Sequence, residues 1–212
     1  VNDDEEWYVA FAGSDTFRMV VHGKQTHGAT PWRGIEPIVA GADIVMTAQS
    51  IVSRRMDINK EPVVLTFGVF DAGQRFNIVP DTATLQGTLR TFDVGMRDQA
   101  LADLRLVATS VAAAHGATVE LEVPVATRVN PVNYNDPELT ARVTASLVNV
   151  LGKDSVLLAD RWTASEDFPQ LGISVKAPSV YFFVGGTPKD QDTSTVAFNH
   201  SPRFYVDEGA LK

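Results

Sequence analysis

The spacing of apolar side chains changes its period several times along residues 15–125, and the order of these changes limits the folds open to this chain. Some stretches are rich in β-branched and aromatic residues or alternate apolar with polar residues, as strands do. Others carry apolar residues three and four positions apart, as helices do. The predicted strands cover residues 17–22, 63–70, 82–92 and 118–125, and the predicted helices cover residues 35–55 and 93–114.

This order of strand, helix, strand, strand, helix, strand predicts a ferredoxin-like β-α-β-β-α-β sandwich. In that fold two helices cover one face of an antiparallel sheet. Local signals agree with the helix limits, because Pro37 suits the first turn of the first helix and Arg54 and Arg55 suit its last turn. Gly116 is placed to end the second helix. The unit would occupy residues 15–125.

Residues 126–212 do not continue the pattern. A helix is predicted over residues 138–151, with Asp136 as its N-cap and Pro137 in its first position. Residues 179–184 predict a buried strand because the last five of them are apolar, and such a strand is typical of a larger parallel or mixed sheet. A single buried strand cannot form such a sheet alone.

The predicted organisation therefore has three parts. Residues 1–14 are a residual lead-in, residues 15–125 are the ferredoxin-like domain, and residues 126–212 are the C-terminal part of an α/β domain. We expect the N-terminal part of that α/β domain to be missing from this chain. A short helix within residues 162–172 and a final helix beginning at Asp207 complete the expected elements.

The net charge of −8 argues against a nucleic-acid partner or an anionic membrane, since both require a basic surface. The chain contains no cysteine, which excludes disulfides, thiolate metal sites and a cysteine nucleophile. No apolar run is long enough to span a bilayer. None of this fixes the compartment, and the cytoplasm is the default expectation.

Several short motifs occur in one order along the chain, and together they carry a resemblance to a known family. The chain resembles the amidohydrolase branch of the dinuclear-metal aminoacylase and carboxypeptidase family, which includes hippurate hydrolase, N-acyl-L-amino acid amidohydrolases and hydrolases of indole-acetyl amino acids. The motifs lie at residues 14–19, 23–32, 49–54, 73–81, 87–92, 165–168 and 199–204. Each motif is weak alone, but their common order makes coincidence a poor explanation.

The resemblance implies a metal-dependent amidohydrolase, a C–N hydrolase rather than an endopeptidase, that cleaves the amide of small N-acyl or N-aroyl amino acids. It implies a catalytic α/β domain that holds two divalent metals. Zinc is the expected metal, and manganese, cobalt and nickel are the alternatives. It also implies that the ferredoxin-like domain is a lid inserted into the catalytic domain, and that this lid forms a homodimer. Most metal ligands of the family precede the lid, so this chain alone is expected to be inactive.

Two histidines match motifs of the family. His200, in residues 199–202, looks like a late metal ligand, and imidazole is a good ligand for zinc. His27 looks like the lid histidine that reaches the active site of the partner subunit, where it would polarise the amide carbonyl and stabilise an oxyanion. The alternative for each is a solvated histidine in a loop. His22 and His115 receive only structural roles, at a strand end and at a helix C-terminus.

Four further residues match the family. Asn77 and Arg90 look like the lid residues that hold the substrate. The guanidinium of Arg90 can bind the free carboxylate of the substrate in bidentate fashion. Arg90 could instead be a solvent-facing strand residue, and Asn77 a turn residue. Glu166 and Asp167 could support the metal ligands, or place negative charge at a helix N-terminus.

Two hypotheses of different kinds follow. In the first, the chain is a fragment of the amidohydrolase just described, with its dimer formed by pairing of lid sheet edges or by the first lid helix. In the second, it is a non-catalytic dimerisation or ligand-binding module derived from that family. A ferredoxin-like RNA-binding domain is discarded, because the chain lacks the basic charge and the paired strand aromatics.

Overall fold

The computed structural model describes residues 9–125, 129–188 and 190–211. These residues form two compact units, which divide between Val180 and Tyr181. The first unit holds all the regular strands and the long helices, and the second consists of loops and one short helical turn.

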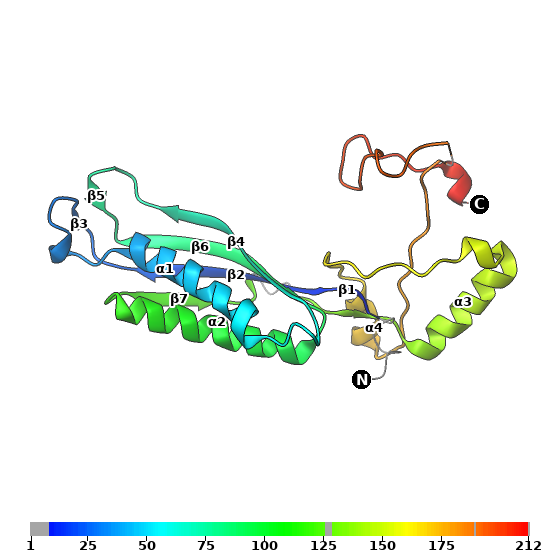
Figure 1. Cartoon of the computed structure of the whole chain (residues 1–212), viewed down its shortest axis with the longest axis horizontal. Coiled ribbons are helices and arrows are strands. Elements are labelled where there is room, and N and C mark those ends of the chain that lie inside the picture. Colours follow the sequence, from blue (N-terminus) through cyan, green and yellow to red (C-terminus); the bar gives the residue numbers. More distant parts are fainter. Residues whose placement is uncertain (1–8, 126–128, 189, 212) are drawn as a thin grey trace. The chain divides into compact units, whose positions relative to one another are not determined.

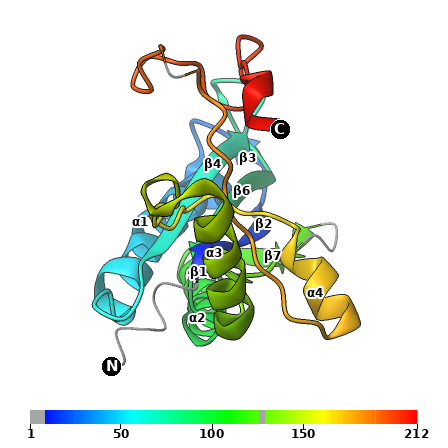
Figure 2. The ribbon, with the colours of Figure 1, turned by 90° about the vertical axis from the view of Figure 1, so that its right-hand side faces the viewer.

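A four-stranded antiparallel core sheet organises the first unit, in the order β4-β6-β2-β7. If these strands are numbered one to four along the chain, the order is 2-3-1-4, which is the ferredoxin-like arrangement. This confirms the predicted fold class. Figures 1 and 2 show α1 and α2 on one face of the sheet. The elements are β2 (Gly13–His22), α1 (Pro37–Ser50), β4 (Val63–Ala72), β6 (Thr82–Thr91), α2 (Val94–Ala114) and β7 (Thr118–Glu122).

The core lies between this sheet and the two helices. Alternate residues of β2, among them Phe17, Met19 and Val21, are buried, while the residues between them are partly or fully exposed. Ile44 of α1 and Leu104 of α2 belong to the same buried cluster. Because strand side chains alternate between faces, the other face of the sheet is polar and open. One face therefore stabilises the fold, and the other can carry function.

A second, smaller pairing was not predicted. Two short strands, β3 (Thr26–His27) and β5 (Ile78–Val79), pair antiparallel and join the loop after β2 to the loop after β4. A 3₁₀ turn, Pro31–Arg33, follows β3. These elements form one end of the domain, which we call the tip.

The predicted first helix is not α-helical throughout. Its last five residues, Ile51–Arg55, form a π-helical turn. Arg55 of this turn makes a 2.9 Å ion pair with Asp103 of α2, whose side chain is largely buried. The pair connects the end of the first helical segment to the second helix.

The opposite end of the sheet, which we call the root, is extended by one short strand. The strand β8 (Val129–Asn130) pairs with the start of β2, whereas β1 (Val9–Phe11) pairs with β9 (Asn133–Tyr134) in a separate two-stranded sheet. The helix α3 (Pro137–Leu151) follows, and the Asp136 carboxylate accepts a 2.8 Å bond from the Leu139 amide. The predicted N-cap is therefore confirmed. A 3₁₀ turn (Lys153–Ser155) and α4 (Pro169–Val175) complete the regular elements of this unit.

The strand predicted over residues 179–184 is wrong, because this stretch has no regular structure. A strand requires a neighbour for its backbone hydrogen bonds, and among the described residues no strand pairs with it. Phe182 and Val184 are more than half exposed. The helix predicted from Asp207 is a single 3₁₀ turn, Glu208–Leu211. None of the described helices is both long and apolar enough to cross a membrane.

Candidate functional site

The tip brings together two of the residues that the sequence singled out. His27 stands opposite Ile78 in the β3–β5 pair, and the Gly28 amide donates a 2.8 Å hydrogen bond to the Asn77 carbonyl. A Cβ atom on residue 28 would lie 3.1 Å from the Asn77 carbonyl oxygen, so glycine permits this close approach. His27 and Asn77 are thus neighbours at one exposed edge of the tip.

Hydrogen bonds fix the orientation of the His27 ring. Its Nδ1 atom accepts a 3.0 Å bond from the Ala29 amide. The His27 carbonyl accepts a 2.8 Å bond from the Thr30 amide, which closes the turn. A ring nitrogen that accepts a hydrogen bond carries no proton, so the neutral ring must carry its proton on Nε2. His27 can therefore donate an Nε2–H bond to an oxygen of another molecule.

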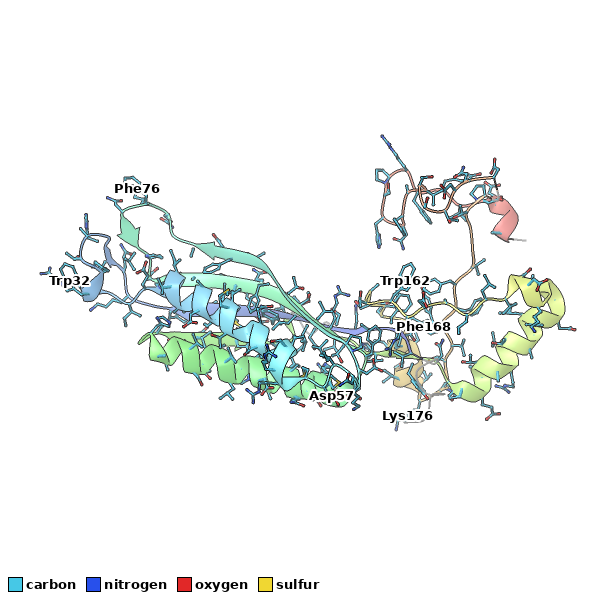
Figure 3. All side chains as sticks on the ribbon, in the orientation of Figure 1. Trp32, Asp57, Phe76, Trp162, Phe168 and Lys176 are labelled. Atoms are coloured by element: carbon cyan, nitrogen blue, oxygen red, sulfur yellow. The ribbon has the colours of Figure 1, made fainter. Side chains whose placement is uncertain are left out.

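Two aromatic side chains and an open hollow accompany this pair. Phe76 is fully exposed and Trp32 is exposed by 76%. Figure 3 labels both at the tip. A hollow of about 590 Å³ is lined in part by Gly28, Pro31 and Phe76. The tip therefore combines hydrogen-bonding groups with apolar surface, as binding sites for small organic molecules do.

Arg90 lies near the root, at the other end of β6. In the register of β6 with β2, Arg90 faces Ser14 and Thr82 faces His22. Eight residues of strand separate these positions, a distance of about 27 Å at about 3.4 Å per residue. The structure therefore brings His27 and Asn77 together but separates both from Arg90.

One edge of the Arg90 guanidinium is anchored. Its Nη1 atom donates a 2.9 Å hydrogen bond to the Thr163 carbonyl. Among the described residues no protein group accepts from its Nε or Nη2 atoms, which together form the edge that binds a carboxylate in bidentate fashion. Arg90 is thus held on one side and available on the other.

Glu166 and Asp167 follow closely in the same segment. The Ser165 hydroxyl accepts a 3.0 Å bond from the Asn130 side chain, and the Asp167 carbonyl accepts from the Gln170 amide at the start of α4. Glu166 is half-buried and Asp167 is exposed. Neither carboxylate makes an ion pair or hydrogen bond with another described residue, so both interpretations of this pair stay open.

His200 lies in the second unit, residues 181–212. Its backbone φ is +70°, which is uncommon outside glycine, and its side chain is exposed. In the described part of the chain, no three histidine, aspartate or glutamate side chains gather closely enough to hold a metal ion. The described residues therefore do not by themselves fit a site for two metals, and we derive no reaction step through metals.

Comparison with known proteins identifies the family. Residues 9–115 match the family described as the peptidase dimerisation domain of M20. The chain belongs to the M20 peptidase family. The matched range covers β1 to the end of α2, so the ferredoxin-like unit is an M20 dimerisation domain.

Two relatives with different named activities are similar to this chain over almost its whole length. Thermostable carboxypeptidase 2 of Saccharolobus solfataricus is 34% identical over 95% of this chain and 49% of its own length. N-acetyl-L-cysteine deacetylase of Bacillus subtilis is 30% identical over 94% of this chain and 44% of its own length. The chain thus spans about half the length of these relatives, which are M20 hydrolases.

A solved structure supports the same assignment. The Bacillus subtilis YXEP protein, described as a dinuclear metal-binding peptidase of the M20 family, is 26% identical and superposes with a TM-score of 0.68. The match covers 96% of this chain and 47% of that protein. The fold of this chain is thus shared with a peptidase that binds two metals.

The sequence did not predict the contacts that organise the two ends of the dimerisation domain. The β3–β5 pair has a signal, because Ile78 and Val79 are β-branched residues flanked by turn residues. The bond from Arg90 to Thr163 has no such signal, since it joins residues 73 positions apart through a backbone carbonyl.

Proposed function

We propose that this chain is the lid and the following segment of a metal-dependent amidohydrolase that cleaves N-acyl or N-aroyl amino acids. The observation that carries the proposal is the oriented Nε2–H donor of His27 beside Asn77. A donor aimed outward from a rigid turn can polarise an amide carbonyl and stabilise the oxyanion formed when water adds to it. The names of the two relatives, carboxypeptidase and N-acetyl-L-cysteine deacetylase, both describe cleavage of a C–N bond in a substrate that carries a carboxylate.

Arg90 supplies the second part of the proposal. Its Nε and Nη2 edge would bind the carboxylate of the amino acid, while the Thr163 carbonyl holds the other edge. This assigns Arg90 to substrate binding and His27 to carbonyl activation, with Asn77 as an additional hydrogen-bonding group at the tip.

The distance between the two ends of the lid implies a dimer. A small N-acyl amino acid cannot reach across about 27 Å of sheet, so one substrate cannot contact both His27 and Arg90 of the same chain. We propose that the tip of each lid serves the active site of a second copy. His27 and Asn77 then act in the partner's site, and Arg90 acts in the site of its own chain.

The surface for the second copy is the β4 edge together with α1. In the described part of the chain β4 pairs with β6 alone, which leaves its other edge open to another strand. Val39 and Met46 of α1 and Val69 and Phe70 of β4 are exposed. This apolar strip beside an unpaired edge suits a two-fold interface with an identical copy.

Two metals, for which zinc is the expected element, would supply an activated water when bound. His200 is proposed as one ligand, with Glu166 and Asp167 near the ligands as supporting groups. The other ligands would come from residues that the described part of the chain does not bring together. The residues of this chain bind, orient and polarise the substrate.

A chimera tests the function. The matching part of the Saccharolobus solfataricus carboxypeptidase is replaced by this chain, and hydrolysis of hippurate and N-acetyl amino acids is measured. His27→Ala should lower kcat by about 100-fold or more, as loss of an oxyanion donor does. Arg90→Lys should chiefly raise KM. His115→Ala is the matched control on the same domain. A chimera that is folded and metal-loaded, but in which His27→Ala has no effect on kcat, would refute the proposal.

Mixing variants tests action across the dimer. His27→Ala and His200→Ala subunits are each expected to be inactive alone. Random mixing should restore about a quarter of the sites, because half of the dimers are mixed and each has one complete site. No recovery, with mixed dimers present, would place His27 in the site of its own chain.

The second candidate is a non-catalytic dimerisation or ligand-binding module. The observation that favours it is that the described residues assemble no metal site. Metal analysis and hippurate hydrolysis by the chimera distinguish the two, since a module would form a dimer but neither retain metal nor turn over substrate.

A further inference from the structure

A short segment after α3, residues 161–165, is fastened to the root of the lid by contacts of several kinds. The Arg161 guanidinium bonds the Glu61 carboxylate, and the Trp162 backbone pairs with the chain around Phe11. Thr163 accepts the bond from Arg90 described above. Glu61 and Arg161 are 100 residues apart in sequence, so these contacts set how the segment meets the domain.

The ion pair is partly withdrawn from water. One Arg161 Nη1 atom lies 2.9 Å and 2.8 Å from the two Glu61 oxygens, and the two side chains are exposed by only 23% and 16%. The same guanidinium lies over the Phe92 ring, 4.8 Å from its centroid. Stacking and charge pairing act on one planar group, which restricts it more than a surface ion pair would.

The backbone bridge extends this attachment by one residue. The Trp162 amide donates a 2.9 Å bond to the Ala10 carbonyl, and the Ala12 amide donates a 3.1 Å bond to the Trp162 carbonyl. The Trp162 ring meets the buried Phe11 ring edge-on, with centroids 6.3 Å apart. Trp162 is thereby fixed between Arg161 and Thr163. We call Glu61, Arg161 and the Trp162 bridge the clasp.

We infer that Arg161 and Glu61 are positioning residues for Arg90. The clasp holds the Thr163 carbonyl two residues beyond Arg161, and that carbonyl anchors the Arg90 Nη1 atom. Glu61 approaches from the same corner, since it precedes Val63 by two residues and Val64 faces Arg90 across the sheet. The available edge of Arg90 is therefore aimed by an ion pair that does not itself touch the substrate.

The inference rests on the proposed function in one respect, namely that Arg90 binds the carboxylate of the substrate. The positioning itself is a statement about the mobility of one guanidinium. A purely stabilising ion pair would lower the stability of the fold when removed, but would leave the Arg90 side chain as restricted as before. The two roles therefore differ in a measurable quantity.

Side-chain NMR of ¹⁵N-arginine-labelled full chain measures that quantity, with the Arg90 signals assigned from an Arg90→Lys spectrum. Rotation about the Arg90 Cζ–Nη1 bond should be slow in the parent chain and at least about tenfold faster in Arg161→Ala, because the Thr163 carbonyl is no longer held. Amide exchange at Ala12 and Trp162 should accelerate with it. Arg142→Ala, on exposed α3, removes the same charge elsewhere and should change neither signal.

Two further variants guard against a trivial loss of fold. Arg161→Lys keeps the charge but not the stacked plane, and should give an intermediate rate. Glu61→Arg combined with Arg161→Glu restores opposite charges and should recover part of the restriction. Urea midpoints accompany each variant. If folded Arg161→Ala and the charge-swapped chain both leave the Arg90 rotation unchanged, the clasp does not position Arg90 and the inference is wrong.

Titration with hippurate separates this inference from the proposed function. A faster Arg90 rotation with about tenfold weaker hippurate binding supports both. A faster rotation with unchanged hippurate binding supports the clasp and refutes the carboxylate role of Arg90. An unchanged rotation refutes the clasp, whatever the affinity.

Discussion

The ion pair between Asp15 and Arg97 yields the strongest stability prediction for this fold. Asp15 lies on the buried face of β2 and its side chain is exposed by only 1%, while the Arg97 side chain on α2 is exposed by 24%. Arg97 Nε donates to Oδ2 at 2.6 Å, and Nη2 donates to Oδ1. This bidentate contact with the carboxylate raises the pKa of Arg97 further above its ordinary value. Removal of the arginine therefore leaves a buried carboxylate without its cation.

The expected cost follows from that burial. Breaking a buried ion pair by removing one partner costs about 3–5 kcal/mol, because the remaining charge is desolvated and uncompensated. Since Arg97 retains some contact with water, we expect Arg97→Ala to lower the free energy of unfolding by about 3 kcal/mol, at the lower end of that range. A domain of this size should then lose about 6–12 °C in Tm. Asp15→Val combined with Arg97→Met removes both charges and should recover most of the loss, to within about 1 kcal/mol of the parent.

Urea unfolding followed by circular dichroism at pH 7 measures these differences, with Arg105→Ala on the exposed side of α2 as the matched control. The control should change the free energy of unfolding by less than about 0.5 kcal/mol. The reasoning fails if Arg97→Ala costs less than about 1 kcal/mol with an unchanged m-value. It also fails if the double variant is no more stable than Arg97→Ala alone.

Three further changes probe the core, a helix cap and the dimer. Gly87→Ala should cost about 3 kcal/mol or more, since its Cβ would overlap the Thr66 carbonyl and the Phe17 ring, whereas Gly68→Ala, beside open space, should be nearly neutral by urea unfolding. Asp93→Ala should cost about 1 kcal/mol by removing the α2 cap. The hydrogen bond from Lys60, and to a smaller extent that from the Met96 amide, lowers the pKa of Asp93. The charged form of Asp93 therefore stabilises the fold above about pH 4. The stability that this charge contributes should disappear as the pH falls through the lowered pKa of Asp93. The free energy of unfolding of Asp93→Asn, which keeps the cap acceptor, should decrease less in acid than that of the parent. Met46→Glu should weaken dimerisation at least about tenfold in sedimentation velocity, while Thr109→Glu on α2 should not; an unchanged dimer would exclude α1 from the interface.

The ferredoxin-like domain could be predicted from sequence because its signals are local. Strand alternation around Leu85, helical spacing in α1 and α2, and the proline in the first turn of α1 each depend on neighbours within a few residues. The order of these elements then leaves few sheet topologies. The predicted fold class was confirmed for that reason.

The prediction over residues 179–184 failed for a complementary reason. An apolar run indicates burial, but whether it forms a strand depends on a second strand, which is often distant in sequence. Among the described residues no partner strand exists for it, and its side chains are partly exposed. Sequence identified the tendency of this segment and could not supply its partner.

The residues of the candidate site could be predicted from the sequence, but the distances between them could not. Motifs single out His27, Asn77 and Arg90, but motifs carry no distances, so nothing in the sequence separates Asn77 from Arg90. The register of β6 with β2 supplies that reason, because it places Arg90 at one end of the sheet while the β3–β5 pair holds His27 and Asn77 at the other. Under the roles proposed above, each end of the domain serves a different site, because about 27 Å of strand separates the two ends. The match to a dimerisation domain agrees with pairing of two copies. In the dimer proposed above, the tip of one chain would serve the site of the other, and the chemistry proposed for His27 depends on that arrangement.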